Sequence, residues 1–406
     1  MIRRASGAIV FPRGFRAGAV HAGLKKNPEA PDLTIIASLV QASCAGCFTT
    51  NRVSAAPVKW SRAVSQKGFA RAIVANAGAA NACTGKEGYR HARRMAEATA
   101  RALGMSVGEG VLVASTGMIG VMLPIEKIEE GIRQAAKILS RSPLMGHRAS
   151  LAILTTDLVT KEARATLKLG KSTVRLGAMA KGSGMIAPKL ATMLAFITTD
   201  ALISPEMLRL ALNMAVNGSF NALTVDGHTS TNDTVVILAN GLAGNPRIEH
   251  TAGGFPDFSR ALKELCVHLA KEIARDGEGA TKLIEVRVSG APTFSLAEKV
   301  AFAIATSPLV KTAVFGEDPN WGRIVSAAGF SCQEVREEKM SLALNGVRVF
   351  RRGLAVEGEA RNRARLAMRS KKLLMHLDLG LGHFTRVVWT CDFSYDYVRI
   401  NSAYST

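Results

Sequence analysis

The sequence has few aromatic residues and no long uninterrupted apolar run. Phe, Trp and Tyr make up 5% of the 406 residues, whereas all hydrophobic types together make up 48%. This balance is typical of a globular core built from aliphatic side chains and alanine. No stretch of about 18 uncharged apolar residues occurs, so we predict no transmembrane helix. The apolar segment at 7–11 is too short for a signal peptide, and we expect a cytoplasmic protein.

Cysteine is also scarce, with six residues in the chain. Cys44 and Cys47 have the spacing of a redox or metal-ligand pair, but no second Cys or His pair at zinc spacing accompanies them. We therefore interpret them as two reduced thiols and expect no metal, with a redox or metal role as the alternative.

Acidic residues are few relative to basic ones. The chain has 52 Lys and Arg against 32 Asp and Glu, a formal net charge of +20. If 361–374 is helical, Arg361, Arg365, Arg369 and Lys372 share one face, which could contact nucleic acid. No aromatic residues interleave to stack on bases, so we favour a solvated face and expect no nucleic-acid partner. The positive field would also steer anionic substrates.

Helix and strand patterns alternate along the chain, without internal repeats or low-complexity segments. Such alternation indicates an α/β fold with helices packed on sheets. A near-phosphate-loop pattern at 165–172 lacks its first glycine, so a turn between strands is favoured there. The periodicities predict helices at 124–139, after Ser204, at 262–273 and from a capping box at 295–298, and a strand at 284–288.

The segment 181–197 carries the strongest chemical signal. A loop rich in Gly passes through Pro188 into Ala191 and Thr192, and a continuous apolar run follows. Short apolar runs bounded by Gly and Pro are typical of buried strands, so Thr192 would lie at the mouth of a core strand. If the chain breaks between Ala191 and Thr192, the freed α-amine of Thr192 could serve as the base for its own hydroxyl. From the local sequence alone, the alternative is that Thr192 has no catalytic role and is simply a β-branched residue at the start of a strand.

Further stretches along the chain fit one family together with 181–201. They are Gly-Phe-Arg-Ala at 14–17, Phe-Thr-Thr-Asn-Arg-Val at 48–53, Ala-Asn-Ala-Gly-Ala-Ala-Asn-Ala-Cys-Thr-Gly at 75–85, Ser-Thr-Gly at 115–117, Thr-Ser-Thr-Asn-Asp-Thr at 229–234, Asp-Gly-Glu-Gly-Ala-Thr-Lys at 276–282, Asp-Pro-Asn-Trp-Gly-Arg-Ile at 318–324 and Tyr-Val-Arg-Ile-Asn at 397–401. In this order, and nearly end to end, the chain resembles the ornithine acetyltransferases, the glutamate N-acetyltransferases of arginine biosynthesis.

The resemblance implies a fold and a set of site residues. The fold would be an αββα-type sandwich similar to self-processing N-terminal-nucleophile hydrolases, in two lobes. Cleavage would give chains 1–191 and 192–406. Thr192 would be the nucleophile, and the Thr116 hydroxyl and Gly117 N–H would form the oxyanion hole. Substrate would be bound by Thr155, Lys181, Thr192, Glu278, Asn401 and Thr406, with Lys181 on a carboxylate and Glu278 on the ornithine ammonium. From the residues alone, Lys181 could equally be a surface lysine.

The implied reaction moves an acetyl group from N-acetylornithine to glutamate by a ping-pong route. No metal or organic cofactor would be needed, and acetyl-CoA would be a co-substrate in a bifunctional enzyme. The fragments would assemble as two of each. A hydrolase of the same fold, such as an N-terminal-nucleophile aminopeptidase, is the alternative. Lys189 and His228 depart from the family pattern, which usually has Asn and Asp there. Lys189 could alter the rate of cleavage, and His228 could alter the response of the activity to pH.

Overall fold

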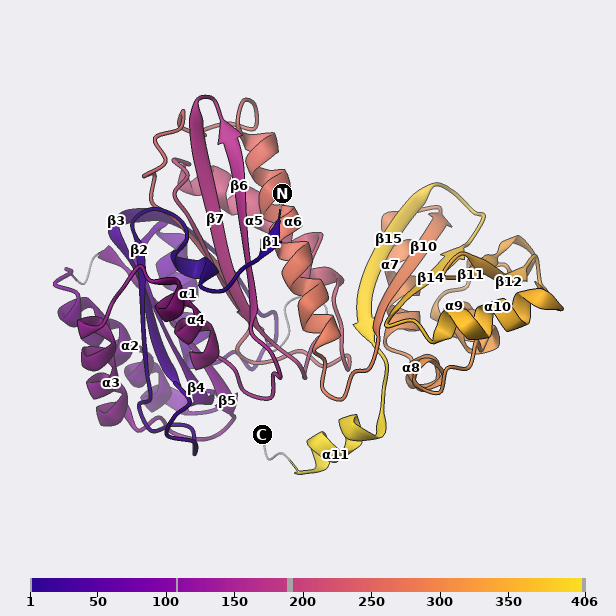
Figure 1. The fold of residues 1–406 in the computed structure, drawn as a ribbon, viewed down its shortest axis with the longest axis horizontal. Helices are drawn as coiled ribbons and strands as arrows, with labels where there is room; N and C mark the ends of the chain where they lie inside the picture. The colour runs from indigo at the N-terminus through magenta and orange to yellow at the C-terminus, as the bar shows by residue number, and fades with distance from the viewer. Residues whose placement is uncertain (1, 107–108, 188–192, 404–406) are drawn as a thin grey trace. The chain divides into compact units, whose positions relative to one another are not determined.

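The computed structural model describes residues 2–106, 109–187 and 193–403 (Figure 1). The chain divides into two compact units, the first made of Met1–Asn221 and His228–Ile273 and the second of Ala222–Gly227 and Ala274–Ser405. The backbone thus enters the second unit for six residues before it returns to the first. There, Leu223 forms a parallel bridge with Trp389.

The described part of the first unit contains nine strands of one sheet and six α-helices. In chain order its elements are β1 (Arg3–Arg4), η1 (Ala8–Val10), β2 (Phe15–Val20), β3 (Leu33–Phe48), α1 (Ala56–Gln66), β4 (Phe69–Ala79), α2 (Gly85–Ala102), β5 (Val111–Met118), α3 (Ile125–Lys137), α4 (Pro143–Ala152), β6 (Lys161–Leu169), β7 (Ser172–Lys181), β8 (Leu194–Thr199), α5 (Pro205–Asn217), η3 (Phe220–Ala222), β9 (Thr234–Ala239) and α6 (Phe255–Arg275).

The long strand β3 joins two halves of this sheet. The strand order is β1-β6-β7-β8-β9-β3-β4-β5, and β2 pairs with the first part of β3. The second part of β3 pairs instead with β9, from Ser43 to Phe48. β3 therefore belongs to a β2–β5 half through one end and to a β6–β9 half through the other.

The two halves share one apolar core. Side chains of the first half, such as Ile36 and Ile73, cluster with Phe196 of β8 and Val236 of β9. Because strand side chains alternate between faces, the neighbouring residues of β3, β4 and β5 point the other way and pack on α2 and α3. Figure 1 shows α6 running alongside β6 and β7, and its periodic apolar residues are buried. The predicted αββα sandwich and the two lobes are confirmed.

The second unit holds a six-stranded sheet covered by helices. Its strand order is β13-β12-β11-β14-β10-β15. Its core combines alternate residues of β10 with the apolar faces of α7 and α9. In chain order the elements are β10 (Leu283–Ala291), α7 (Phe294–Ala305), α8 (Pro308–Phe315), α9 (Trp321–Ser331), η4 (Glu337–Lys339), β11 (Ser341–Leu344), β12 (Val347–Arg351), β13 (Leu354–Ala355), α10 (Glu359–Met368), β14 (Lys372–Asp378), β15 (Phe384–Cys391) and α11 (Tyr395–Ala403).

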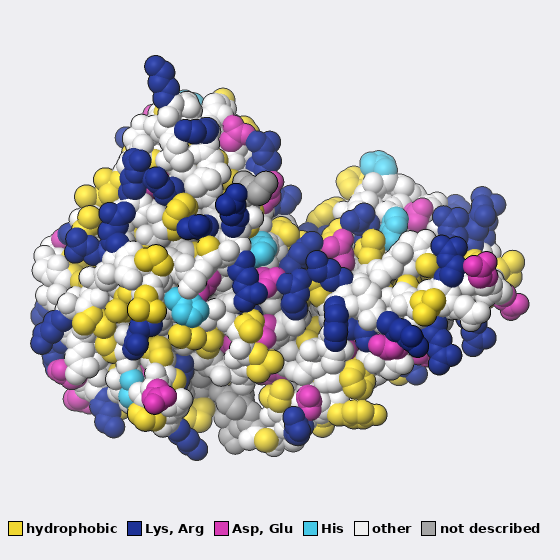
Figure 2. Space-filling model, viewed as in Figure 1, with side chains coloured by type: hydrophobic (Ala, Val, Ile, Leu, Met, Phe, Trp, Pro, Cys, Tyr) yellow, Lys and Arg dark blue, Asp and Glu magenta, His cyan; other side chains and the backbone are white. Residues whose placement is uncertain are grey.

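Most of the predicted elements are present, and two details were wrong. α3, α5, α6, β10 and the tight turn between β6 and β7 match the predictions. The capping box was misplaced, because the hydroxyl of Thr293, not Ser295, accepts the hydrogen bond that caps α7. The helix predicted for 361–374 ends at Met368, since β14 begins at Lys372. The four basic residues therefore do not share one helix face. Figure 2 shows Lys and Arg spread over the visible face of both units.

The geometry of Cys44 and Cys47 argues against a shared metal or disulfide. Both lie on β3, three residues apart, so their side chains leave opposite faces of the strand. Burial raises the pKa of each thiol to about 12, which disfavours the thiolate that redox or metal chemistry needs. Separately, none of the described helices is both long enough and apolar enough to cross a membrane.

Candidate active site

The loop that was predicted to be cleaved joins two neighbouring strands. Lys181 ends β7, and its register partner on β8 is Leu194. The connecting segment therefore leaves and re-enters the sheet at adjacent points. Ala191 and Thr192, like Lys189, lie outside the described residues. Met193 is the first described residue after them, and β8 begins directly beyond it, as the apolar run predicted.

The predicted oxyanion residues lie at the end of β5. Thr116 is buried and pairs with Ala77 of the parallel strand β4, while Gly117 pairs with Gly78. Gly117 has a φ of +126°, and a Cβ there would come within 2.3 Å of the Gly78 carbonyl carbon. Only glycine fits this conformation and this close approach. Both residues thus close the core strand β5.

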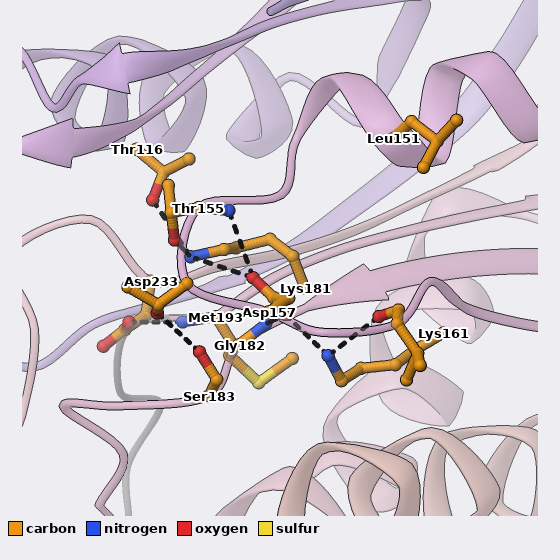
Figure 3. A network of polar contacts seen from close by, with 12 residues as sticks. Thr116, Leu151, Thr155, Asp157, Lys161, Lys181, Gly182, Ser183, Met193 and Asp233 are labelled. Carbon is orange, nitrogen blue, oxygen red and sulfur yellow. Dashed lines mark hydrogen bonds and ion pairs between the residues drawn. The ribbon is translucent and has the colours of Figure 1, made fainter. Parts of the chain in front are cut away.

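The Lys181 ammonium connects two of the other predicted site residues (Figure 3). Its Nζ donates to Thr155 Oγ1 at 2.8 Å and to Thr116 Oγ1 at 3.3 Å. The Lys181 side chain is 2% exposed, so the interpretation as a surface lysine was wrong. Three residues from three separate segments of the chain thus meet at one cation.

These contacts determine what the threonine hydroxyls can do. Each hydroxyl accepts a hydrogen bond from the Lys181 ammonium, so its own hydrogen remains available for donation. A hydroxyl that accepts from a cation is polarised and becomes a better donor. Thr116 is therefore suited to stabilise a developing negative charge on an acyl oxygen.

A buried carboxylate holds this lysine cluster together. Asp157 accepts hydrogen bonds from Lys161 Nζ at 2.6 Å and from Gly182 N at 2.7 Å, and Lys181 Nζ lies 3.9 Å from its other oxygen. Burial alone would raise the pKa of Asp157. The charges of Lys161 and Lys181 and these hydrogen bonds outweigh burial and lower its pKa to about 2. Asp157 is consequently ionised and anchors both cations.

Replacing this anchor should cost stability in a pH-dependent way. Asp157→Asn leaves two buried lysines without their carboxylate, and we expect a loss of about 3–5 kcal/mol at pH 7. Because the folded pKa is lowered from 3.8 to about 2, the carboxylate stabilises the fold above about pH 4, and this stabilisation is lost as pH falls toward 2. Urea unfolding at pH 7 and at pH 2.5 should therefore show a difference between wild type and variant that narrows in acid.

The matched control is Asp257→Asn, which removes a carboxylate from an exposed pair with Arg260. Exposed ion pairs contribute about 0–1 kcal/mol, so this variant should unfold nearly as the wild type does. Equal effects of the two substitutions at pH 7 would contradict the anchoring role of Asp157.

The second unit contains two further predicted residues in direct contact. Asn401 Nδ2 of α11 donates to Glu278 Oε2 at 2.9 Å. The Glu278 loop is itself fixed, because Ser394 Oγ donates to the Gly279 carbonyl at 2.6 Å and Gly279 has a positive φ. The remaining predicted residue, Thr406, lies outside the described residues. The structure thus brings Thr116, Thr155 and Lys181 together in the first unit, and Glu278 and Asn401 in the second.

Sequence reasoning missed four polar residues around the first-unit cluster. Besides Asp157 and Lys161, the segment before β9 contributes Asn232 and Asp233, both buried. Asn232 and Asp233 lie within the matched stretch 229–234, but no property of the sequence alone assigned them a partner. His228, which departs from the family pattern, is exposed just before this segment.

Comparison with known proteins identifies the family of this chain. The ArgJ family model matches residues 16–406. The arginine biosynthesis bifunctional protein ArgJ of Symbiobacterium thermophilum is 49% identical over 402 residues, which cover 99% of each chain. The chain belongs to the ArgJ family. The ArgJ protein of Geobacillus kaustophilus is 45% identical and covers 99% of this chain and 97% of its own. The family assignment made from sequence, and with it the assignment to an enzyme family of arginine biosynthesis, is confirmed.

One solved ArgJ structure is informative about chain length. The crystal structure of the ArgJ protein of Bacillus halodurans is 43% identical and superposes with a TM-score of 0.50. The matched region covers 98% of the crystallised chain but 52% of the present chain. The crystallised chain therefore corresponds to about half of the present ArgJ sequence.

Proposed function

We propose that this ArgJ chain cleaves itself between Ala191 and Thr192 and then transfers an acetyl group from N-acetylornithine to glutamate. The observation that carries the proposal is the meeting of Thr116, Thr155 and the Lys181 ammonium beside the start of β8. Lys181 faces Leu194 in the strand register, two residues after the proposed nucleophile. A polarised hydroxyl donor and a buried cation thus lie next to the start of β8, which follows Thr192 by two residues in the sequence.

The proposed chemistry uses one threonine twice. In the precursor, the Thr192 hydroxyl attacks the Ala191 carbonyl, and the amide bond between Ala191 and Thr192 breaks, which frees the α-amine and leaves an ester on Oγ. Water then hydrolyses this ester, which releases the Ala191 carboxylate and restores the Thr192 hydroxyl. In the mature enzyme this amine, with a reference pKa of about 7.7–8.0, takes the hydroxyl proton as Oγ attacks the acetyl carbonyl. Thr116 and Gly117 N–H would stabilise the oxyanion. The proton passes to the departing ornithine amine, and the glutamate amine then attacks the acetyl-Thr192 ester.

The remaining roles belong to the same proposal. Lys181 and Thr155 would bind the carboxylate and backbone of the amino-acid substrate. Glu278, fixed by the Asn401 amide, would bind the ornithine ammonium. Acetyl-CoA would serve as a second acetyl donor if this enzyme is bifunctional, the word that the relatives' names carry. The cytoplasmic location, the assembly of two fragments of each kind and the independence from cofactors stay predictions.

The half-length crystallised relative supports the cleavage step. Cutting at Ala191–Thr192 leaves two chains of about half the sequence each, and a crystallised chain of about that size exists in the family. The strand pairing is compatible with the cut, because the register of β7 with β8, from Leu176 to Lys181 on β7, does not involve the loop between them.

Two measurements on the wild-type protein test the proposal. Intact mass and a denaturing gel should show two fragments that meet at Ala191 and Thr192. Loss of N-acetylornithine should then accelerate when glutamate is added, with N-acetylglutamate as the product. Cleavage combined with a glutamate-independent release of acetate would favour the hydrolase alternative. An uncut but active protein would contradict the role of the Thr192 α-amine.

A further inference from the structure

The segment Asn232–Asp233, immediately before β9, contacts both sides of the proposed site. Asn232 Nδ2 donates to the Ala80 carbonyl at 2.6 Å and to the Ser115 carbonyl at 2.8 Å. The Ser115 carbonyl belongs to the peptide that continues into Thr116. The Asn232 side chain is held in turn, because its Oδ1 accepts from Thr231 Oγ1 at 2.6 Å. One amide therefore fixes the backbone that carries the oxyanion donors.

Asp233 makes the corresponding contact on the nucleophile side (Figure 3). Its Oδ1 accepts from the backbone N–H of Met193 at 3.0 Å, and the next residue, Thr234, donates its N–H to the Met193 carbonyl at 3.1 Å. Met193 is thereby held on both its peptide groups. It follows Thr192 directly in the chain, so the contact restrains the backbone next to the proposed nucleophile.

The second carboxyl oxygen of Asp233 has an unusual environment. Asp233 is 0% exposed, and its Oδ2 has no hydrogen-bond partner within the described ranges 2–106, 109–187 and 193–403. Burial raises the pKa of the Asp233 carboxyl well above its ordinary value, with opposing contributions from the Met193 N–H and the Lys181 charge. A neutral carboxyl has one acceptor and one donor, which a side-chain amide reproduces in shape and polarity.

We infer that Asn232 and Asp233 form a positioning element that sets the separation between the oxyanion donors and Thr192. Asn232 holds the Ser115–Thr116 peptide, and Asp233 holds Met193, from adjacent positions of one backbone. This inference rests on the proposed role of Thr192 and adds to it two residues that would act through the groups they hold. A misplacement of about 1 Å between reacting groups can cost about 100-fold in rate, so the restraint has a measurable consequence.

The test compares cleavage rates of full-length variants in cell-free translation by pulse–chase. Asn232→Asp removes both amide donations and should slow the appearance of fragments by about 10–100-fold. The matched control is Asn245→Asp. Asn245 is also buried and donates its amide to two carbonyls, those of Leu202 and Pro246, in the segment between β8 and α5 and in that before α6. The control should lower thermal stability similarly and leave the cleavage rate within about threefold of wild type.

Asp233 is tested by a pair of variants. Asp233→Ala removes the acceptor for Met193 N–H and should slow cleavage by about 10–100-fold, whereas Asp233→Asn keeps an acceptor and should restore most of the rate. If Asp233→Ala does not fold, the cleavage rate of Asp233→Asn tests the positioning role by itself. A cleavage rate of Asp233→Asn as low as that of Asn232→Asp would overturn this role. Wild-type cleavage rates in Asp233→Ala, or equal rates in Asn232→Asp and Asn245→Asp, would also overturn it. An uncut wild type would instead refute the proposed function, so the two failures are distinct.

Discussion

Thr192→Ala should accumulate as one uncut chain of 406 residues with no transferase activity. The reason is that a single hydroxyl would serve both as the cleavage nucleophile and as the carrier of the acetyl group, and alanine removes it without adding bulk. Intact mass and a coupled assay for N-acetylglutamate measure the two losses on the same sample. Since β8 begins beyond Met193, we expect the uncut variant to fold.

Thr192→Ser is the matched control for this substitution. Serine keeps the hydroxyl and the α-amine, so it should cleave and transfer, although more slowly if the methyl group helps to orient the nucleophile. Two fragments from Thr192→Ala at the same boundary would show that another group breaks the chain.

Thr116→Ala should lower kcat by about 10²–10³-fold while KM changes little. Its hydroxyl accepts from Lys181 and would donate to the oxyanion, an interaction that is formed only in the transition state. Steady-state kinetics with N-acetylornithine and glutamate separate the two constants. Thr116→Ser, which retains the hydroxyl, should recover most of the rate.

Thr155→Ala distinguishes oxyanion stabilisation from a disturbance of Lys181. Thr155 accepts from the same ammonium at a shorter distance, 2.8 Å, so its loss perturbs Lys181 at least as much. Its proposed role is substrate binding, and we therefore expect KM to rise with a smaller change in kcat. If both alanine variants raise KM and leave kcat unchanged, Thr116 acts through Lys181 and not as an oxyanion donor.

Local patterns predicted the elements that carry the site better than the contacts within it. The apolar run after Thr192 is a buried strand because its own residues demand burial on both faces, a property that is visible in a window of six residues. Gly117 could likewise be expected at a special backbone position, although the sequence did not show that Gly78 is what excludes a Cβ there.

The buried charges could not be predicted in this way. Lysine is rarely buried, so Lys161 and Lys181 suggest surface positions until Asp157 is known to lie between them. Asn232 is 117 residues from Ser115 in sequence, and no local pattern records such a contact. The prediction of the α7 cap was wrong for a smaller reason. Thr293 and Ser295 are both suitable N-cap residues, and which of them caps the helix depends on where the preceding strand ends.

The order of strands in the large sheet gives the proposed cut a consequence for assembly. β7 and β3 would belong to the first fragment, while β8 and β9, which lie between them, would belong to the second. The second fragment therefore supplies two central strands of the sheet, without which β7 and β3 of the first fragment would have no strands between them. Folding before the cut is unimolecular, but refolding afterwards must reunite two chains and becomes dependent on concentration. The strand pairings of the mature enzyme would thus form once, while the chain is still uncut. Two separated fragments would re-form the same pairings less readily than the uncut chain formed them.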